Sequence, residues 1–409
     1  MNLKTYRIVF IGGSYGGLRS LKHFINLFQN SPSAQVEIEI YLIDPRAGFI
    51  NILGIPKAIV DIEFAVKSYL NVENYNINFS SVQSTDQAFI EAMSKSMPKE
   101  ILPPNLRVNF IHGKVISFKD EYSITFSVIN SSEIQTLDFD YAVYSAGRRR
   151  TWPFDPQGIN QNQYIDEMKS TKNKIERANI ITVIGGGALG IEIAGEIKDT
   201  YPEKEVKLVH PHPFLPPELY ASKNLKSGIK RQIEEVGVNL LLNTRIKEEL
   251  ENGNLKTTDN KIIQSELNFW CNFHKNNIEP LMPYFQDSIE LSTGEAKTDE
   301  TLLLQGYKNI FVIGDIVNLP IIKTAGGAYR HGETVAQSLY NLTITDSMEI
   351  SKIDIVNWPK GMTIVVGHNR CCSQWNNDGD GKVVENDSVI LEMYKDYCNS
   401  SAKTFLNIS

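Results

Sequence analysis

The sequence contains few cysteines and no long apolar run. Its 409 residues include four cysteines, Cys271, Cys371, Cys372 and Cys398, which are too few for a disulfide framework. None of them is spaced as C-x-x-C or C-x4-C, so a dithiol redox centre of the disulfide-reductase kind is not expected. No run of about 18 apolar residues is present, and we therefore expect no membrane-spanning helix.

Acidic residues outnumber basic ones, 48 to 41. The formal net charge is -7 at pH 7, and the single basic run is the tripeptide Arg148–Arg150. Such a chain has no global field that favours nucleic acid or an anionic membrane, so neither is an expected partner. The chain reaches an apolar run by Ile8, which leaves no room for a signal or transit peptide before it. We therefore expect a cytoplasmic protein.

Two segments of the chain repeat one pattern. Residues 7–28 and residues 179–197 each begin with a β-branched apolar run, continue with glycines and end in a helical pattern of apolar residues. A further apolar strand follows each segment, at 36–44 and at 205–210. This order predicts two βαβ units with parallel strands and crossover helices.

The second repeat contains a complete dinucleotide-binding fingerprint. Gly185, Gly187 and Gly190 fit G-x-G-x-x-G directly after a strand. The first glycine allows the tight turn, the second lets a pyrophosphate approach the backbone, and the third lets helix and strand pack closely. Free amides at the start of the helix then face the phosphates.

The first repeat departs from the fingerprint at one position. Ser14 stands where the second glycine of the motif is expected, and a serine hydroxyl is small and can donate to a phosphate oxygen. The next strand ends in Asp44, which can accept hydrogen bonds from both hydroxyls of an adenosine ribose. The glycines of this turn are Gly12, Gly13, Gly16 and Gly17.

The equivalent strand of the second repeat ends in a histidine. His210, closely followed by His212, is neither the acid that selects NADH nor the arginine that binds the 2′-phosphate of NADPH. The sequence therefore leaves the choice between NADH and NADPH open.

Two later strands end in turns of small residues. The strand at 139–144 runs into Ala146 and Gly147, and the strand at 309–313 runs into Gly314 and Asp315. A lone Gly-Asp pair is usually a tight turn. Beside two fingerprints, however, such an aspartate can bind the ribityl hydroxyls of a flavin.

Taken together, these residues resemble a known family. The order of fingerprint, small-residue turn, second fingerprint and Gly-Asp is that of flavoprotein reductases with two dinucleotide-binding domains. Residues 42–60, 185–210 and 365–370 are most similar to the apoptosis-inducing-factor-like branch. That branch includes the ferroptosis suppressor proteins and is related to type II NADH dehydrogenases.

The resemblance implies an FAD-dependent NAD(P)H oxidoreductase, with non-covalent FAD on the first unit and NADH or NADPH as co-substrate on the second. Hydride passes from nicotinamide to flavin, and electrons pass on to a quinone or a similar small acceptor. Gly12, Ser14 and Gly17 would take the FAD pyrophosphate, Asp44 its ribose and Asp315 its ribityl chain.

Several further residues gain candidate roles from the resemblance. The helix that opens at Thr324 and Ala325 would point at the flavin, where its N-terminus stabilises developing negative charge. Glu192 matches a glutamate near the nicotinamide–flavin stack and is the catalytic candidate; the alternative is an acid favourably placed in the first turn of a helix. Arg46 and Lys57 match basic positions of the flavin-side loop, with a solvated surface charge as the alternative.

The expected fold is α/β, with two Rossmann-like dinucleotide-binding domains, the second inserted in the first, and a small C-terminal α+β region. We assign residues 1–150 to the first part of the FAD-binding domain and 151–300 to the NAD(P)H-binding domain. Residues 301–345 are the return segment of the FAD-binding domain, and 346–409 are the C-terminal region.

Two stretches leave alternatives open. Asn272 and Phe273 replace a second Thr-Gly turn of the family, and a phenylalanine rarely adopts positive φ. A flavoprotein with weakened redox activity that acts through interactions, for example in cell-death signalling, is therefore the alternative function. Residues 388–406 carry a short apolar stripe, which either docks on the flavin domain or makes peripheral membrane contact. Residues 375–387 partly match a calcium loop but lack its final glutamate, so no metal site is expected.

Overall fold

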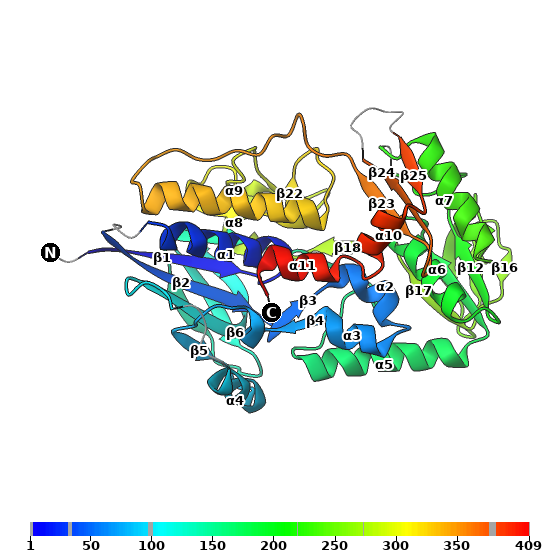
Figure 1. The fold of residues 1–409 in the computed structure, drawn as a ribbon, viewed down its shortest axis with the longest axis horizontal. Helices are drawn as coiled ribbons and strands as arrows, with labels where there is room; N and C mark the ends of the chain where they lie inside the picture. The colour runs from blue at the N-terminus through cyan, green and yellow to red at the C-terminus, as the bar shows by residue number, and fades with distance from the viewer. Residues whose placement is uncertain are drawn as a thin grey trace.

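The chain forms two parallel sheets that lie side by side along its long axis (Figure 1). A computed structural model describes residues 3–31, 35–96, 101–218, 220–272, 274–375 and 382–408. Buried apolar side chains form two clusters, and the second cluster also takes in side chains between Ile50 and Tyr69 and from the C-terminal region. The predicted α/β fold with two Rossmann-like units is confirmed.

The first sheet has the strand order β21-β9-β1-β2-β6-β7-β8, with β5 paired to β6. Its central strands run parallel, and β7 and β8 continue it as an antiparallel extension. Its strands are β1 (Lys4–Ile11), β2 (Val36–Asp44), β5 (Ser81–Gln83), β6 (Leu106–Asp120), β7 (Ser123–Val128), β8 (Gln135–Asp138), β9 (Tyr141–Tyr144) and β21 (Ile310–Val312).

Two helices pack against each other on this sheet, α1 (Tyr15–Gln29) and α9 (Ala325–Thr343) (Figure 1). Leu18, Leu21 and Phe28 of α1 are buried, as their spacing predicts. The two backbones approach closely, because a Cβ on Gly332 would lie 2.6 Å from the carbonyl oxygen of Gly16. Segments far apart in the sequence thus build one layer.

The second sheet has the order β13-β12-β11-β17, and all its strands are parallel. An antiparallel meander of β14, β15 and β16 follows β13 along the chain. The strands and associated helices are α5 (Gln161–Arg177), β11 (Ile180–Ile184), α6 (Ala188–Thr200), β12 (Glu205–Val209), α7 (Lys223–Glu235), β13 (Asn239–Leu241), β14 (Ile246–Glu249), β15 (Leu255–Thr257), β16 (Ile262–Ile263) and β17 (Leu267–Trp270).

An antiparallel strand pair connects the two units. The chain leaves the first unit through β10 (Arg148–Arg150) and returns through β18 (His274–Asn276), which pairs with it. Because β21 then joins β9 in the first sheet, the second unit is an insertion in the first. The exact residue bounds of the domains stay predictions. Smaller elements are β3 (Gly48–Ile50), α2 (Ile55–Ala58), α3 (Ile62–Ser68), β4 (Tyr69–Asn71), α4 (Gln87–Lys95), α8 (Met282–Phe285), β19 (Ile289–Glu290), β20 (Glu295–Lys297) and β22 (Val317–Asn318).

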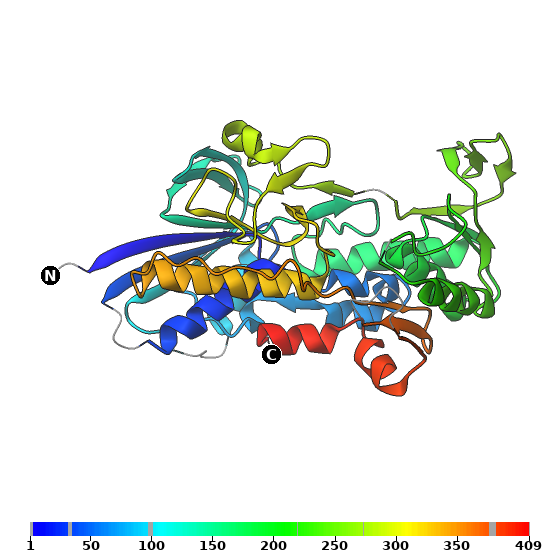
Figure 2. The same ribbon diagram turned by 90° about the horizontal axis from the view of Figure 1, so that it is seen from above.

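The C-terminal region contacts both units. Its antiparallel sheet of β23 (Met362–Val365), β24 (Cys371–Gln374) and β25 (Val383–Glu385) packs on α6 and α7. The chain then turns through α10 (Ser388–Tyr394) to α11 (Asn399–Leu406), which lies beside α1 (red in Figures 1 and 2). Docking on the flavin side is therefore observed for α11, whereas α10 buries no residue.

Across these described ranges, no helix is both long enough and apolar enough to cross a lipid bilayer.

Candidate active site

The first glycine turn has the close packing that a dinucleotide fingerprint requires. Gly12 adopts φ 99°, and a Cβ on Gly17 would overlap with the carbonyl oxygen of Gly12. Gly13 and Gly16 lie in the same turn. Ser14 is the N-cap residue of α1, but its hydroxyl makes no capping bond. The amides at the start of α1 and this hydroxyl are thus placed for an external anion.

Asp44 lies beside this turn at the end of β2. Its carboxylate accepts hydrogen bonds from the backbone N–H of Gly13 at 2.6 Å and of Arg46 at 2.8 Å. Burial raises the pKa of Asp44, although the charge of Arg46 and these two N–H groups lower it. The Arg46 guanidinium donates to the carbonyl of Pro156 at 2.7 Å.

The turn after β9 lies next to the first glycine turn. The Ser145 hydroxyl donates to the carbonyls of Ile11 and Gly12 at 2.9 and 2.8 Å. Asn277 closes the other side, since its side chain donates to the carbonyl of Ala146 and its backbone N–H to that of Gly147. Gly147 has φ 64°, with no heavy atom within 4 Å of a Cβ built there.

Asp315 follows β21 and is held by the basic tripeptide. Its Oδ2 lies 2.9 Å from Arg148 Nε and 3.8 Å from Arg150 Nη2, and its backbone carbonyl accepts from Arg148 Nη2 at 2.8 Å. Gly314 before it has φ 83° and open space at its Cβ position. The sequence analysis assigned no role to Arg148 or Arg150, because nothing in the sequence indicates that β10 meets the end of β21.

The start of α9 completes this edge of the sheet. The Thr324 hydroxyl caps the helix by accepting from the N–H of Gly327 at 3.0 Å, and Ala325 is its first residue. His331 was not predicted. Its Nδ1 accepts from the N–H of Gly314 at 3.2 Å, and burial lowers its pKa to about 4, so the ring is neutral at pH 7.

These groups together fit an FAD. Parallel strands β1, β9 and β21 end at the same edge of the sheet, which is where open α/β sheets bind ligands. The edge offers positive-φ glycines with free space, Gly147 and Gly314, and carboxylates at both ends, Asp44 and Asp315. The individual residue roles stay predictions.

The second glycine turn repeats the first. Gly185 adopts φ 117°, a Cβ on Gly190 would overlap with the carbonyl oxygen of Gly185, and Gly187 is the N-cap of α6. The N–H of Gly186 donates to Nδ1 of His210 at 3.0 Å. Burial, followed by the charges of His212 and Arg245, lowers the pKa of His210 to about 4. This turn fits the pyrophosphate of NADH or NADPH.

Glu192 lies in α6 at the junction with the C-terminal sheet. Burial raises its pKa to about 8; a hydrogen bond from the Val365 backbone lowers it and nearby Glu196 raises it further. The carboxyl is therefore largely protonated at pH 7. Glu196, one helical turn later, accepts from the Tyr397 hydroxyl at 2.8 Å. Strongly shifted acids of this kind are typical of functional sites.

Three further sequence predictions stay predictions. The Lys57 ammonium donates to the carbonyl of Lys395 at 3.1 Å, in the C-terminal region, and its role beside the flavin is untested. Asn272 is exposed, and Phe273 lies outside the described residues. Of the calcium-like stretch, 376–381 lies outside the described residues, whereas Asp387 caps α10 by accepting from Val389 and Ile390.

Comparison with known proteins assigns the family. The model of the family described as pyridine nucleotide-disulphide oxidoreductase matches residues 6–332. The chain belongs to this family. It is an oxidoreductase that uses FAD and a nicotinamide nucleotide, and both cofactor predictions are confirmed.

Relatives of known name support the resemblance. Oxidoreductase OXR1 of Ajellomyces capsulatus is 25% identical over 88% of this chain and 80% of its own. Ferroptosis suppressor protein 1 of Mus musculus is 24% identical over 92% of this chain and 88% of its own. Apoptosis-inducing factor homolog A of Dictyostelium discoideum is 25% identical over 82% of this chain and 77% of its own.

Solved structures share the fold at lower identity. NDH2 from Plasmodium falciparum in complex with NADH has a TM-score of 0.67 and 14% identity, covering 95% of this chain and 93% of its own. The sulfide:quinone oxidoreductase of Aquifex aeolicus has a TM-score of 0.67 and 13% identity. The match covers 98% of this chain and 92% of that protein's chain.

Proposed function

We propose that this protein is an FAD-dependent NAD(P)H oxidoreductase of the cytoplasm that reduces a quinone or a similar small acceptor. The observation that supports this proposal is the repetition of one glycine turn. The turns at Gly12–Gly17 and Gly185–Gly190 have the same close packing, and each follows a parallel strand, one in each of the two connected sheets. All four cysteines are free, as is usual in a reducing compartment.

The first turn and its neighbours would hold FAD. The amides and hydroxyl around Ser14 bind the pyrophosphate, Asp44 the adenosine ribose and Asp315 the ribityl chain. Arg148 keeps Asp315 in position. When bound, FAD would accept a hydride from the nicotinamide and would pass electrons on to the acceptor.

The chain's own contribution is placement and proton supply. The N-terminus of α9, opened by Thr324 and Ala325, stabilises negative charge beside the flavin site. Glu192, with its raised pKa, holds a proton at its carboxyl at neutral pH, as a residue that serves proton transfer near pH 7 must. We propose Glu192 as the catalytic residue because it matches a glutamate that the family has near the nicotinamide–flavin stack and because it holds this proton.

The quinone part of the proposal rests on relatives. The structurally similar protein from Aquifex aeolicus is named a sulfide:quinone oxidoreductase. Val389 and Met393 of α10 are exposed apolar residues, which suits a protein that meets an apolar acceptor or a membrane surface.

An anaerobic titration tests the proposal. The purified protein should carry flavin absorbance that bleaches within seconds of adding NADH or NADPH and returns on adding a soluble quinone. Bound flavin that neither nucleotide bleaches would contradict the reductase and favour the alternative of an interaction protein with weakened redox activity. Failure to retain or take up FAD would contradict the assignment of the first site.

A further inference from the structure

His210 occupies, in the second unit, the place that Asp44 occupies in the first. Each residue ends the second strand of its βαβ unit, and each accepts a hydrogen bond from the second residue of the glycine turn. The distance is 2.6 Å from Gly13 N to Asp44 Oδ2 and 3.0 Å from Gly186 N to His210 Nδ1. An imidazole therefore stands where the first unit has the carboxylate that is expected to bind the ribose, and it keeps the hydrogen bond from the glycine turn.

This contact fixes the tautomer of His210. Because Nδ1 accepts a hydrogen bond, the ring proton of the neutral imidazole lies on Nε2. In the part of the chain that the structure describes, Nε2 is buried and has no hydrogen-bond partner. Asp44 can accept from ribose hydroxyls, whereas the remaining nitrogen of His210 can only donate. An oxygen-rich anion satisfies such a donor better than a hydroxyl does.

An arginine and a second imidazole ring lie near His210. Two backbone hydrogen bonds join the end of β12 to the end of β13. The His210 N–H donates to the Leu241 carbonyl at 2.9 Å, and the Thr244 N–H donates to the His210 carbonyl at 3.0 Å. This brings Arg245 close enough for its charge to act on the imidazole. The ring of His212 lies 5.2 Å from that of His210.

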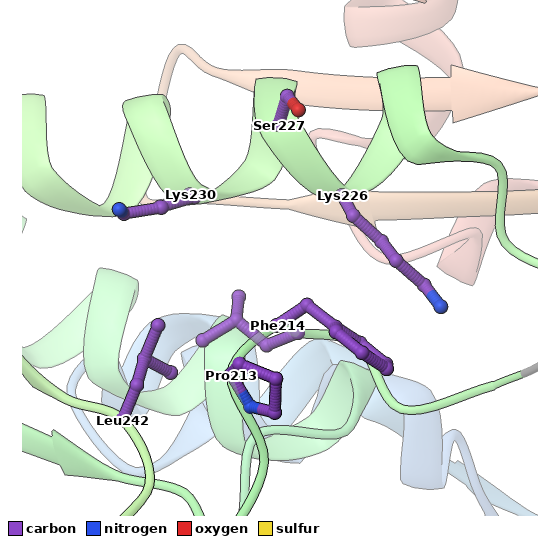
Figure 3. A pocket seen from close by; sticks show the side chains of 7 residues that line it. Pro213, Phe214, Lys226, Ser227, Lys230 and Leu242 are labelled. Atoms are coloured by element: carbon purple, nitrogen blue, oxygen red, sulfur yellow. The ribbon is translucent and has the colours of Figure 1, made fainter.

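A cavity of about 150 Å³ lies in the same unit, between the loop Pro213–Leu215 and α7 (Figure 3). Lys226 and Lys230 on α7 line it, and Lys226 Nζ lies 4.2 Å from the centre of the Phe214 ring. The loop that begins three residues after His210 is thus bordered by two lysines.

We propose that the second unit binds 2′-phosphorylated adenosine, and hence NADPH, in preference to NADH, with His210 and Arg245 as the residues that select the 2′-phosphate. The proposal rests on the proposed function, because it concerns the nicotinamide nucleotide of the same enzyme. One carboxyl group lies at the same turn: Glu218 Oε1 is 3.8 Å from a Cβ built on Gly187, whereas the His210 ring faces Gly186.

Binding of nucleotide fragments tests the proposal without hydride transfer. The flavin-loaded full-length protein is titrated calorimetrically with 5′-AMP and with 2′,5′-ADP. We expect 2′,5′-ADP to bind roughly fivefold more tightly, the effect of one exposed charge contact. The preference should shrink at high salt, because exposed charges are screened.

Variants identify the residues responsible. His210→Asp should reverse the preference, whereas His210→Asn should keep it, since an amide can accept from Gly186 and still donate. Arg245→Gln should weaken the binding of 2′,5′-ADP and leave the binding of 5′-AMP unchanged. Lys247→Gln, which removes an exposed charge two residues away, is the matched control and should change neither constant.

Each remaining outcome decides the matter. Tighter or equal binding of 5′-AMP by the wild type overturns the NADPH preference, and the reductase proposal then stands if NADH bleaches the flavin. An unchanged ratio in both His210→Asp and Arg245→Gln also overturns it. If neither fragment binds and neither nucleotide bleaches the flavin, both proposals fail.

Discussion

Burial makes three ionisable side chains of this protein neutral at pH 7. Glu192 has a pKa near 8, and His210 and His331 have pKa values near 4. In each case the largest cause is removal from water, which penalises the charged form. The two histidines each accept from a glycine amide of a cofactor-binding turn.

Replacing Glu192 by glutamine should change the pH dependence of stability. The pKa of Glu192 rises from an ordinary 4.5 to about 8 on folding. Between these values the folded chain binds a proton that the unfolded chain has released, so the wild type loses stability as pH rises through this window. Glu192→Gln lacks this loss. We expect it to be more stable than the wild type by about 2 kcal/mol or more at pH 8 and nearly equal at pH 5.

Thermal unfolding at the two pH values measures this effect. Glu203→Gln, which makes the same change at an exposed position, is the control and should show no pH-dependent difference. A stability difference for Glu192→Gln that is the same at pH 5 and pH 8 would contradict the assigned pKa.

At the scale of elements, the C-terminal segment links the two units through hydrogen bonds. The Tyr397 hydroxyl donates to Glu196 of α6, and its backbone carbonyl accepts from Asn51 Nδ2 at 3.0 Å. Asn51 in turn accepts from the Tyr15 hydroxyl at 2.6 Å, at the start of α1. Arg19 donates to the carbonyl of Phe405 at 2.5 Å. The segment therefore joins the second unit to the first near both glycine turns.

Tyr397→Phe should loosen this segment. It removes the hydroxyl donor from the Glu196 carboxylate, which is 1% exposed. His368 Nε2 lies 3.5 Å from the other oxygen of this carboxylate. A buried acceptor without its donor costs about 1–3 kcal/mol. Urea denaturation should show this loss, and limited proteolysis should cut the C-terminal region faster. Tyr122→Phe at an exposed position should behave as the wild type; equal stability of both variants would contradict the role of the hydroxyl.

At the scale of the whole molecule, the protein is one βαβ design used twice and joined by β10 and β18. The two glycine turns have the same overlap between a third-glycine Cβ and the first-glycine carbonyl. They are nevertheless expected to hold different cofactors. Single substitutions at equivalent positions should therefore have separable effects.

Gly17→Ala should impair flavin retention, whereas Gly190→Ala should leave flavin bound and abolish its rapid bleaching by NAD(P)H. Each added methyl group forces helix and turn apart, at a cost of roughly 1–3 kcal/mol. Absorbance spectra of the purified variants and anaerobic titration separate the two results. Lys169→Ala, at an exposed position of α5, is the control and should behave as the wild type in both measurements. Loss of flavin in Gly190→Ala and retention in Gly17→Ala would reverse the assignment of the two units.

The sequence determined the two βαβ units, both fingerprints, the resemblance to the family and both cofactors. These features depend on contacts within about 40 residues, where strand pattern, glycine spacing and helix period are visible in the chain itself. Asp44 and the face of α1 formed by Leu18, Leu21 and Phe28 belong to this class.

Only the tertiary structure decided which distant residues meet. The pairing of Arg148 with Asp315 and of Glu196 with Tyr397 joins segments that are 167 and 201 positions apart. Lys57 found its partner in the C-terminal region for the same reason. The sequence also does not reveal the tautomer of His210, because the backbone group that a ring nitrogen faces decides whether that nitrogen accepts or donates. A hydrophobic pattern specifies which face of an element is buried, but long-range packing selects its polar partners and sets their protonation.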